Sequence, residues 1–209
     1  MKVNEIFASI QGEGILIGIP TTFVRMTGCN LRCSWCDTKY AYEEGKEMSC
    51  EEVMAKVKDF SQNHVCITGG EPLLQNEVIS LIQKLMDKGY EVCLETNGSK
   101  SIENIPCLGS MVISLDIKCP SSGMQEKMNF SNLELLSLND QLKFIIADNK
   151  DYEYAKEIIA KYKPTCSLIM TPVGGRKLKE LAEWVLADGL YVRVLPQLHK
   201  LIWGEKKGV

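Results

Sequence analysis

Short apolar runs alternate with longer amphipathic segments along most of the chain. The runs are rich in valine, isoleucine and leucine, which is typical of strands that are buried on both faces of a sheet. We therefore expect strands at residues 22–26, 64–68, 91–96, 111–116, 142–147, 166–171 and 190–195.

The segments between these runs have the spacing and the end signals of helices. Ser49 and Glu52 have the spacing of a capping box, and Gly89 and Gly189 follow two of the segments as C-terminal stops. Residues 98–110 and 121–137 give no clear pattern. We expect helices at residues 49–60, 77–88, 151–162 and 176–187.

Alternation of strands and helices predicts a parallel sheet, either open or curled into a barrel. About six strand–helix units fit into 209 residues, whereas a closed eight-unit barrel usually needs ~250 residues. We therefore predict an α/β fold, a partial (βα)6 TIM-like barrel, that forms a single domain over residues 1–209.

Composition and charge narrow the class of protein. A net charge of -3 with no long block of lysine or arginine argues against binding to nucleic acid. The first residues lack the apolar core of a signal peptide, and no apolar run approaches the ~18 residues that span a bilayer. We expect a cytoplasmic protein that binds neither nucleic acid nor a membrane.

Nine cysteines are many for a reducing compartment, where clustered cysteines bind metals or do redox chemistry more often than they form disulfides. Cys29, Cys33 and Cys36 fall within eight residues, in the pattern C-x3-C-x2-C. The other six are scattered. Those that lie in apolar runs are expected to be small buried hydrophobes: Cys66, Cys93 and Cys166.

Three thiolates on one loop can bind three corners of an iron–sulfur cube and leave the fourth iron without a protein ligand. A structural zinc site usually takes a fourth cysteine or histidine, and His64 and His199 are the only histidines. A redox pair of Cys33 and Cys36 leaves Cys29 without a role. We favour a [4Fe–4S] cluster, and both alternatives stay open.

Polar or glycine-rich segments follow five of the predicted strands. The cysteine motif follows the first strand, residues 69–72 (Gly-Gly-Glu-Pro) the second, and Asn97 the third. Lys118 follows the fourth strand and residues 196–200 the last. Because the C-terminal ends of parallel strands lie on one rim, these segments are predicted to form one site.

The cysteine motif, with Trp35 directly before its last cysteine, and the Gly-Gly-Glu-Pro segment resemble the radical S-adenosylmethionine superfamily. The resemblance implies a partial barrel in which S-adenosylmethionine binds the fourth iron and is cleaved to a 5′-deoxyadenosyl radical. Backbone groups and the Glu71 carboxylate would accept hydrogen bonds from the ammonium group of this cofactor. The implied cofactor contacts are Trp35, Cys36, Asp37, Gly70, Glu71, Ser114, Leu115, Asp116, Lys118 and Lys143.

A second set of short motifs covers nearly the whole chain and resembles 7-carboxy-7-deazaguanine synthases. That resemblance implies a homodimer with a flavodoxin- or ferredoxin-type reductant, in which Mg²⁺ assists the conversion of 6-carboxy-5,6,7,8-tetrahydropterin to 7-carboxy-7-deazaguanine and ammonia, for queuosine biosynthesis. The motifs are Gln11-Gly12-Glu13-Gly14, Arg25, Cys36-Asp37-Thr38, Thr68 and Pro196-Gln197-Leu198-His199-Lys200.

The same resemblance assigns roles to single residues. Glu13 and His199 are the implied catalytic residues, Arg25 would pair with the substrate carboxylate in a forked geometry, and Thr38 would bind Mg²⁺. Ordinary structural roles compete with these, such as a tight turn at Gly12 or a cap at Thr38. The implied substrate contacts are Ile10, Gln11, Gly12, Glu13, Arg25, Thr68 and His199.

Two other functions share the cysteine signature. An activating enzyme that makes a glycyl radical on a protein partner would lack the Gln-Gly-Glu-Gly opening and the terminal Pro-Gln-Leu-His-Lys segment. An electron carrier normally closes all four irons with cysteine, and only three cysteines are clustered here. The Gln-Gly-Glu-Gly and Pro-Gln-Leu-His-Lys motifs therefore favour a deazaguanine synthase over an activating enzyme, and the count of three clustered cysteines disfavours an electron carrier.

Overall fold

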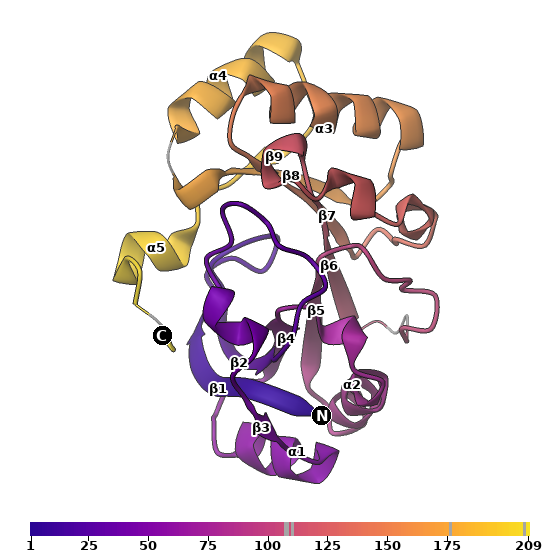
Figure 1. Ribbon diagram of the computed structural model, residues 1–209, viewed down its shortest axis with the longest axis vertical. Helices are drawn as coiled ribbons and strands as arrows, with labels where there is room; N and C mark the ends of the chain where they lie inside the picture. The colour runs from indigo at the N-terminus through magenta and orange to yellow at the C-terminus, as the bar shows by residue number, and fades with distance from the viewer. Residues whose placement is uncertain (107–108, 110, 176, 207) are drawn as a thin grey trace.

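The computed structural model describes residues 1–106, 109, 111–175, 177–206 and 208–209. Within them one sheet has the strand order β3-β1-β2-β4-β5-β6-β7-β8-β9, and Figure 1 shows it curving through the molecule. The strands are β1 (Lys2–Ile10), β2 (Pro20–Met26), β3 (Lys46–Glu47), β4 (His64–Gly69), β5 (Glu91–Thr96), β6 (Met111–Ile117), β7 (Gln141–Ile146), β8 (Ser167–Pro172) and β9 (Arg193–Val194).

All seven predicted strands are present, and they pair in parallel from β2 through to β9. The last one is much shorter than expected, since only Arg193 and Val194 pair with β8. The sequence prediction missed β1, which runs antiparallel to β2, and the short β3 that pairs with it. Most of β1 is only half-buried, so it lacks the continuous apolar run by which the other strands were found.

The helices are α1 (Cys50–Lys58), α2 (Glu77–Asp87), α3 (Asn149–Tyr162), α4 (Leu178–Asp188) and α5 (Leu198–Trp203). The first four were predicted, although the expected start of the fourth, Arg176, lies outside the described residues. Ser49 forms the predicted capping box with Glu52. The short α5 was not predicted.

Two connections between parallel strands carry no α-helix in the part of the chain that the structure describes. One joins β5 to β6, and the other joins β6 to β7 through the 3-10 turns Pro120–Ser122, Gln125–Lys127 and Phe130–Glu134. These are the two segments whose pattern was unclear. The α/β class and the partial barrel are confirmed, although fewer strands are followed by α-helices than in a regular (βα)6 unit.

Side-chain alternation along the strands separates a main core from a functional face. Val24, Ile67 and Leu94 belong to the main core, which also includes buried residues of α1 to α4. The neighbouring positions Phe23, Cys66 and Cys93 form a separate small cluster. Because side chains two residues apart share a face, Arg25, Thr68 and Glu95 follow that cluster on the same face.

The predicted burial of Cys66, Cys93 and Cys166 is confirmed, because each has less than a tenth of its surface exposed. None of the helices in the described ranges is long and apolar enough to cross a membrane.

Candidate active site

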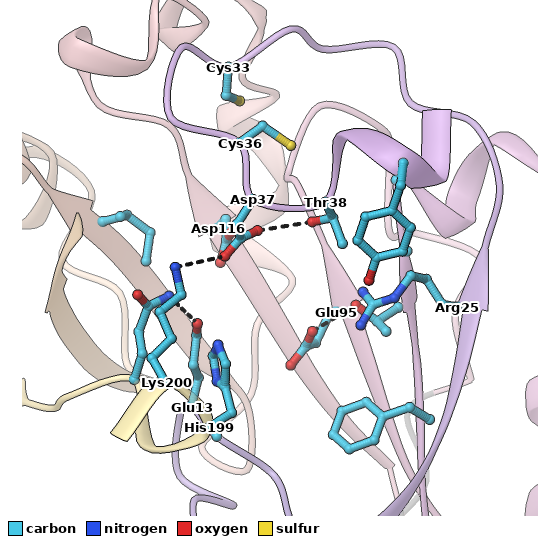
Figure 2. Close-up of a pocket in the computed structure, with 18 of the residues that line it drawn as sticks. Glu13, Arg25, Cys33, Cys36, Asp37, Thr38, Glu95, Asp116, His199 and Lys200 are labelled. Atoms are coloured by element: carbon cyan, nitrogen blue, oxygen red, sulfur yellow. Dashed lines mark hydrogen bonds and ion pairs between the residues drawn. The ribbon is translucent and has the colours of Figure 1, made fainter. Parts of the chain in front are cut away.

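A cavity of about 530 Å³ opens at the C-terminal ends of the parallel strands. The cysteine loop after β2 borders one side of it, and α5 with the last residues of the chain borders another. Figure 2 shows the charged side chains of several strands converging on it. The cavity is lined by most of the predicted site residues: Ile10, Gln11, Gly12, Glu13, Arg25, Cys29, Cys33, Trp35, Cys36, Asp37, Thr38, Thr68, Gly70, Asp116, Lys118, Lys143 and His199.

Three predicted cofactor contacts do not line this cavity. Ser114 and Leu115 are fully buried, and the Ser114 hydroxyl accepts a hydrogen bond from the side chain of Gln141. Glu71 is also fully buried. Its carboxylate accepts hydrogen bonds from the backbone N–H of Leu73 and of Asn97, at 3.0 and 2.7 Å, and from the Thr96 hydroxyl. The Glu71 side chain therefore ties the Gly-Gly-Glu-Pro turn to the end of β5 instead of facing the cavity.

Cys29, Cys33 and Cys36 all line the cavity and are partly exposed. The Leu31 N–H and the Asn97 side-chain amide point at the Cys29 sulfur, at 3.4 and 3.7 Å. Burial raises the pKa of the Cys33 thiol; Lys118 opposes this, and the other two cysteines raise the pKa further. The three thiols are thus close enough to influence one another.

This donor set fits a [4Fe–4S] cluster. Among the described residues no three histidine, cysteine, aspartate or glutamate side chains are arranged around a single metal ion. A cube has a different requirement, because each thiolate binds a separate iron. Three thiols around an open cavity, with N–H donors directed at one sulfur, meet that requirement and leave space for a small molecule.

Gly70 lies where the chain after β4 passes closest to the cysteine loop. A Cβ atom at this position would be 2.0 Å from the Gly28 carbonyl oxygen and 2.9 Å from the Cys29 Cβ. The Glu71 N–H also donates to the Gly28 carbonyl oxygen at 2.8 Å. Only glycine permits this approach without moving the loop.

We expect Gly70→Ala to displace the cysteine loop, to lower the free energy of unfolding by about 1–3 kcal/mol and to reduce the iron bound after reconstitution. Gly109→Ala is the control, because its added Cβ would meet none of the described residues within 4 Å. Iron analysis and denaturant unfolding measure both effects. Wild-type iron content in Gly70→Ala would show that the close approach is not needed.

A network of buried and half-buried charges crosses the floor of the cavity. Lys143 Nζ lies 3.0 Å from Glu13 Oε2 and 3.4 Å from Asp116 Oδ1, and Lys118 Nζ lies 2.7 Å from Asp116 Oδ2. The Gln197 side-chain amide donates to Glu13 Oε1 at 2.7 Å. Residues far apart in the sequence therefore hold the Glu13 carboxylate in one place.

The same network keeps Glu13 ionised. Burial by itself would raise the pKa of Glu13, but Lys143, the Gln197 hydrogen bond and His199 outweigh it and lower the pKa to about 2. Burial likewise disfavours the charged form of Lys118, yet Asp116 raises the pKa of that lysine to about 12. The site thus presents a fixed carboxylate and fixed ammonium groups at neutral pH.

This shift makes part of the stability depend on pH. A pKa near 2 in the folded state, against 4.5 in the unfolded state, stabilises the fold by about 3 kcal/mol above pH 4.5, and this contribution is lost as pH falls towards 2. We expect the difference in free energy of unfolding between wild type and Glu13→Gln to shrink by roughly 2 kcal/mol from pH 6 to pH 3. Urea titrations measure it, and a constant difference would contradict the shift.

Glu95 is a cavity residue that the sequence interpretation missed. Its carboxylate accepts hydrogen bonds from the Thr68 hydroxyl at 2.7 Å and from the Gln11 side chain at 3.2 Å. Gln11 Oε1 in turn accepts from the Glu13 N–H. An acidic residue inside an otherwise apolar predicted strand was the available signal, as Arg25 was in the first strand.

Arg25 lines the cavity beside this group, because it pairs with Thr68 in the sheet. Figure 2 shows its guanidinium near Glu95. Its Nε donates to Glu5 at 2.7 Å, and its guanidinium lies over the rings of Phe7 and Tyr40. The charge is therefore paired and oriented before any substrate arrives. The Glu5 partner was not predicted.

The remaining predicted residues come from the loop after β2 and from α5, which meet at the cavity. The Thr38 hydroxyl donates to Asp37 at 3.0 Å, and Lys200 Nζ lies 3.4 Å from the same aspartate. His199 lies against the β1–β2 turn, since a Cβ at Gly12 would be 2.1 Å from its Nδ1. The Leu198 N–H fixes the start of α5 to the Gly12 carbonyl oxygen.

Comparison with known proteins agrees with this geometry. The radical SAM superfamily model matches residues 23–185. The chain is 40% identical over 209 residues to the 7-carboxy-7-deazaguanine synthase of Thermoplasma acidophilum, with all of both chains covered. It is 35% identical to that of Bacillus subtilis, covering 100% of this chain and 98% of the relative.

The solved structures extend the agreement to the fold. The crystal structure of QueE from Escherichia coli has a TM-score of 0.71 at 23% identity, with 90% of each chain covered. SuiB of Streptococcus suis, at 12% identity, has a TM-score of 0.59 over 81% of this chain and 46% of its own. Superfamily membership implies a [4Fe–4S] cluster and S-adenosylmethionine. The chain therefore belongs to the radical S-adenosylmethionine superfamily and, within it, to the 7-carboxy-7-deazaguanine synthase family.

Proposed function

We propose that this protein converts 6-carboxy-5,6,7,8-tetrahydropterin to 7-carboxy-7-deazaguanine with release of ammonia, in 7-deazapurine biosynthesis. The observation that carries the proposal is one cavity that joins three cysteine thiols to an ionised, fixed Glu13. Full-length relatives at about 40% identity are named for this reaction. An activating enzyme for a protein partner is expected to lack the Gln-Gly-Glu-Gly motif that supplies this carboxylate.

Cys29, Cys33 and Cys36 hold the cluster, which together with S-adenosylmethionine supplies a hydrogen-abstracting radical. The residues of the substrate side would hold the pterin in the same cavity for the proposed ring contraction, in which ammonia is released. Gly70, Trp35 and the Asp116–Lys118 pair form the cofactor side of the cavity in this proposal.

On the substrate side, Glu13 accepts hydrogen bonds from pterin N–H groups. It suits this role because it stays ionised at neutral pH and its other neighbours are donors. Arg25 pairs with the substrate carboxylate, because burial and its Glu5 partner already orient its guanidinium. Thr68 and His199 contact the pterin ring in this proposal, together with Ile10, Gln11 and Gly12, which also line the cavity.

Thr38, next to Asp37, binds Mg²⁺ through oxygen in the proposal, since that ion prefers hydroxyl, carboxylate and water ligands. A flavodoxin- or ferredoxin-type protein supplies the electron. The enzyme works in the cytoplasm as a homodimer and binds neither nucleic acid nor membrane.

The test is an anaerobic reaction. The protein is reconstituted with iron and sulfide and supplied with reductant, S-adenosylmethionine, Mg²⁺ and 6-carboxytetrahydropterin, and the products are followed by mass spectrometry. We expect 7-carboxy-7-deazaguanine and ammonia in equal amounts. Formation of 5′-deoxyadenosine without the deazaguanine would keep the radical chemistry and reject the substrate, and a protein partner would then be the candidate.

A further inference from the structure

Asp151 is a fully buried carboxylate outside the cavity, in the first turn of α3. It does not cap that helix, because Asp148 already does so by accepting from the Asp151 N–H at 3.0 Å. The Asp151 carboxylate instead accepts from the Ala147 N–H, at 2.9 Å, and from both the N–H and the hydroxyl of Ser121. Two of these three hydrogen bonds therefore come from the loop after β6, and the third comes from Ala147, directly after β7.

Ser121 connects the Asp151 carboxylate to the cysteine loop. Its hydroxyl donates to Asp151 and accepts from the Trp35 indole N–H at 3.2 Å. Its carbonyl oxygen accepts from the Ser34 hydroxyl at 2.6 Å, and the neighbouring Ser122 carbonyl oxygen accepts from the Ser34 N–H at 3.1 Å. Ser34 and Trp35 are the two residues between the second and third cysteines of the motif.

Trp35 lies on the cavity wall next to Cys36, and Lys118 Nζ is 5.6 Å from its ring centre. A tilt of the indole would change the shape of the cavity beside the thiols. The Trp35 indole N–H donates to the Ser121 hydroxyl, and that hydroxyl donates its own proton to Asp151. The Asp151 carboxylate therefore fixes the orientation of the hydroxyl that accepts from Trp35. A buried carboxylate that accepts three donors is costly to replace, so it is a rigid anchor.

We propose that Asp151 is a positioning residue that acts through Ser121 to hold Ser34 and Trp35, and so sets the surface on which S-adenosylmethionine meets the cluster. The identity of this ligand rests on superfamily membership and not on the proposed pterin reaction. Asp151 does not touch the cavity, and its effect should appear in cofactor binding and in the cluster spectrum even when no pterin is present.

The structure offers a matched control in Asp140. This buried carboxylate accepts from the N–H and the hydroxyl of Ser137 and from the Ile113 N–H, which is the same donor set that Asp151 has. It lies just before β7, and it does not border the active-site cavity. Asp140→Asn should therefore lower the melting temperature about as much as Asp151→Asn without disturbing the cysteine loop.

The experiment compares anaerobically reconstituted wild type, Asp151→Asn, Ser121→Ala and Asp140→Asn. Iron content, the electron paramagnetic resonance spectrum of the reduced cluster with and without S-adenosylmethionine, and the Kd for S-adenosylmethionine are measured without substrate. We expect Asp151→Asn and Ser121→Ala to raise the Kd about 10-fold, the loss expected for one hydrogen bond. We also expect them to weaken the spectral change on binding, with Asp140→Asn like wild type. If Asp151→Asn does not fold, Ser121→Ala alone tests the proposal. This variant is expected to fold because it leaves the hydrogen bond from the Ala147 N–H to Asp151 intact.

Trp35→Phe keeps an aromatic ring near Lys118 and removes the indole N–H, so it should match Ser121→Ala. The double variant should lose no more affinity than either single variant. Wild-type Kd and spectra in both Asp151→Asn and Ser121→Ala would overturn the proposal, and so would an equal change in Asp140→Asn. If wild type binds the cofactor but makes no deazaguanine, the proposed function fails and this inference still stands or falls on the same binding data.

Discussion

Cys33→Ser is expected to abolish both iron binding and product formation. The Cys33 sulfur sits among Cys29, Cys36 and Lys118, and two thiolates cannot hold three corners of a cube. A serine hydroxyl at this position would not ionise at neutral pH to take the place of a thiolate. We expect turnover to fall at least about 1,000-fold, which corresponds to roughly 4 kcal/mol in the barrier.

Iron and sulfide analysis and the visible absorbance of the reconstituted protein measure the first effect, and product formation measures the second. Cys50→Ser is the control, because Cys50 is partly exposed like Cys33 but lies at the start of α1 away from the cavity. Circular dichroism must show that both variants fold. A Cys33→Ser protein that holds wild-type iron and turns over normally would remove the cluster from this loop.

The buried strands could be predicted well from the sequence, because a strand that is buried on both faces consists of a short run of apolar residues. β5 has the bounds expected from its run, whereas β1 was missed because most of its residues, on both faces, are only half-buried. α5 is six residues long, which is too short for a periodic signal. Its position follows from contacts with the β1–β2 turn that no local pattern encodes.

The location of the site was predictable for a related reason, since a parallel sheet brings the ends of its strands to one rim. The direction of each side chain was not. Glu71 is in the expected turn, but its carboxylate points inward to Thr96 and Asn97, where three donors satisfy it. Glu95 points into the cavity because it is two residues from Cys93, and this was visible only once the face of β5 was known.

Pairing between distant residues was the other unpredictable part. Gln197 reaches Glu13 across 184 positions of sequence, and Lys143 reaches it across 130. The sequence shows that each of these residues is polar and near the predicted rim of the sheet. It does not show which of them pair, because the pairings depend on the tertiary fold. The low pKa of Glu13 is a property of the assembled site and of no single motif.

The chemical role of that assembly is tested by Glu13→Gln. The variant keeps an oxygen for the Gln197 amide, so we expect folding and cluster binding to be retained. It removes the negative charge that faces Lys143 and that accepts N–H groups of the pterin in our proposal. A hydrogen bond to a charged acceptor contributes about 1.5–3 kcal/mol, so kcat/KM for the pterin should fall about 100-fold.

Glu51→Gln is the matched control, because Glu51 also pairs with a lysine, Lys84, but does so on the exposed surface of α1 and α2, where such pairs add little. It should leave both turnover and iron content unchanged. Turnover is measured at substrate concentrations below the wild-type KM, where a binding defect has its full effect. The Kd for S-adenosylmethionine should stay at the wild-type value in both variants, because Glu13 lies on the substrate side of the cavity. Unchanged turnover in Glu13→Gln would take Glu13 out of the reaction and leave it a structural partner of Lys143, whereas a loss of iron would mean that the charge network supports the cluster instead of the pterin.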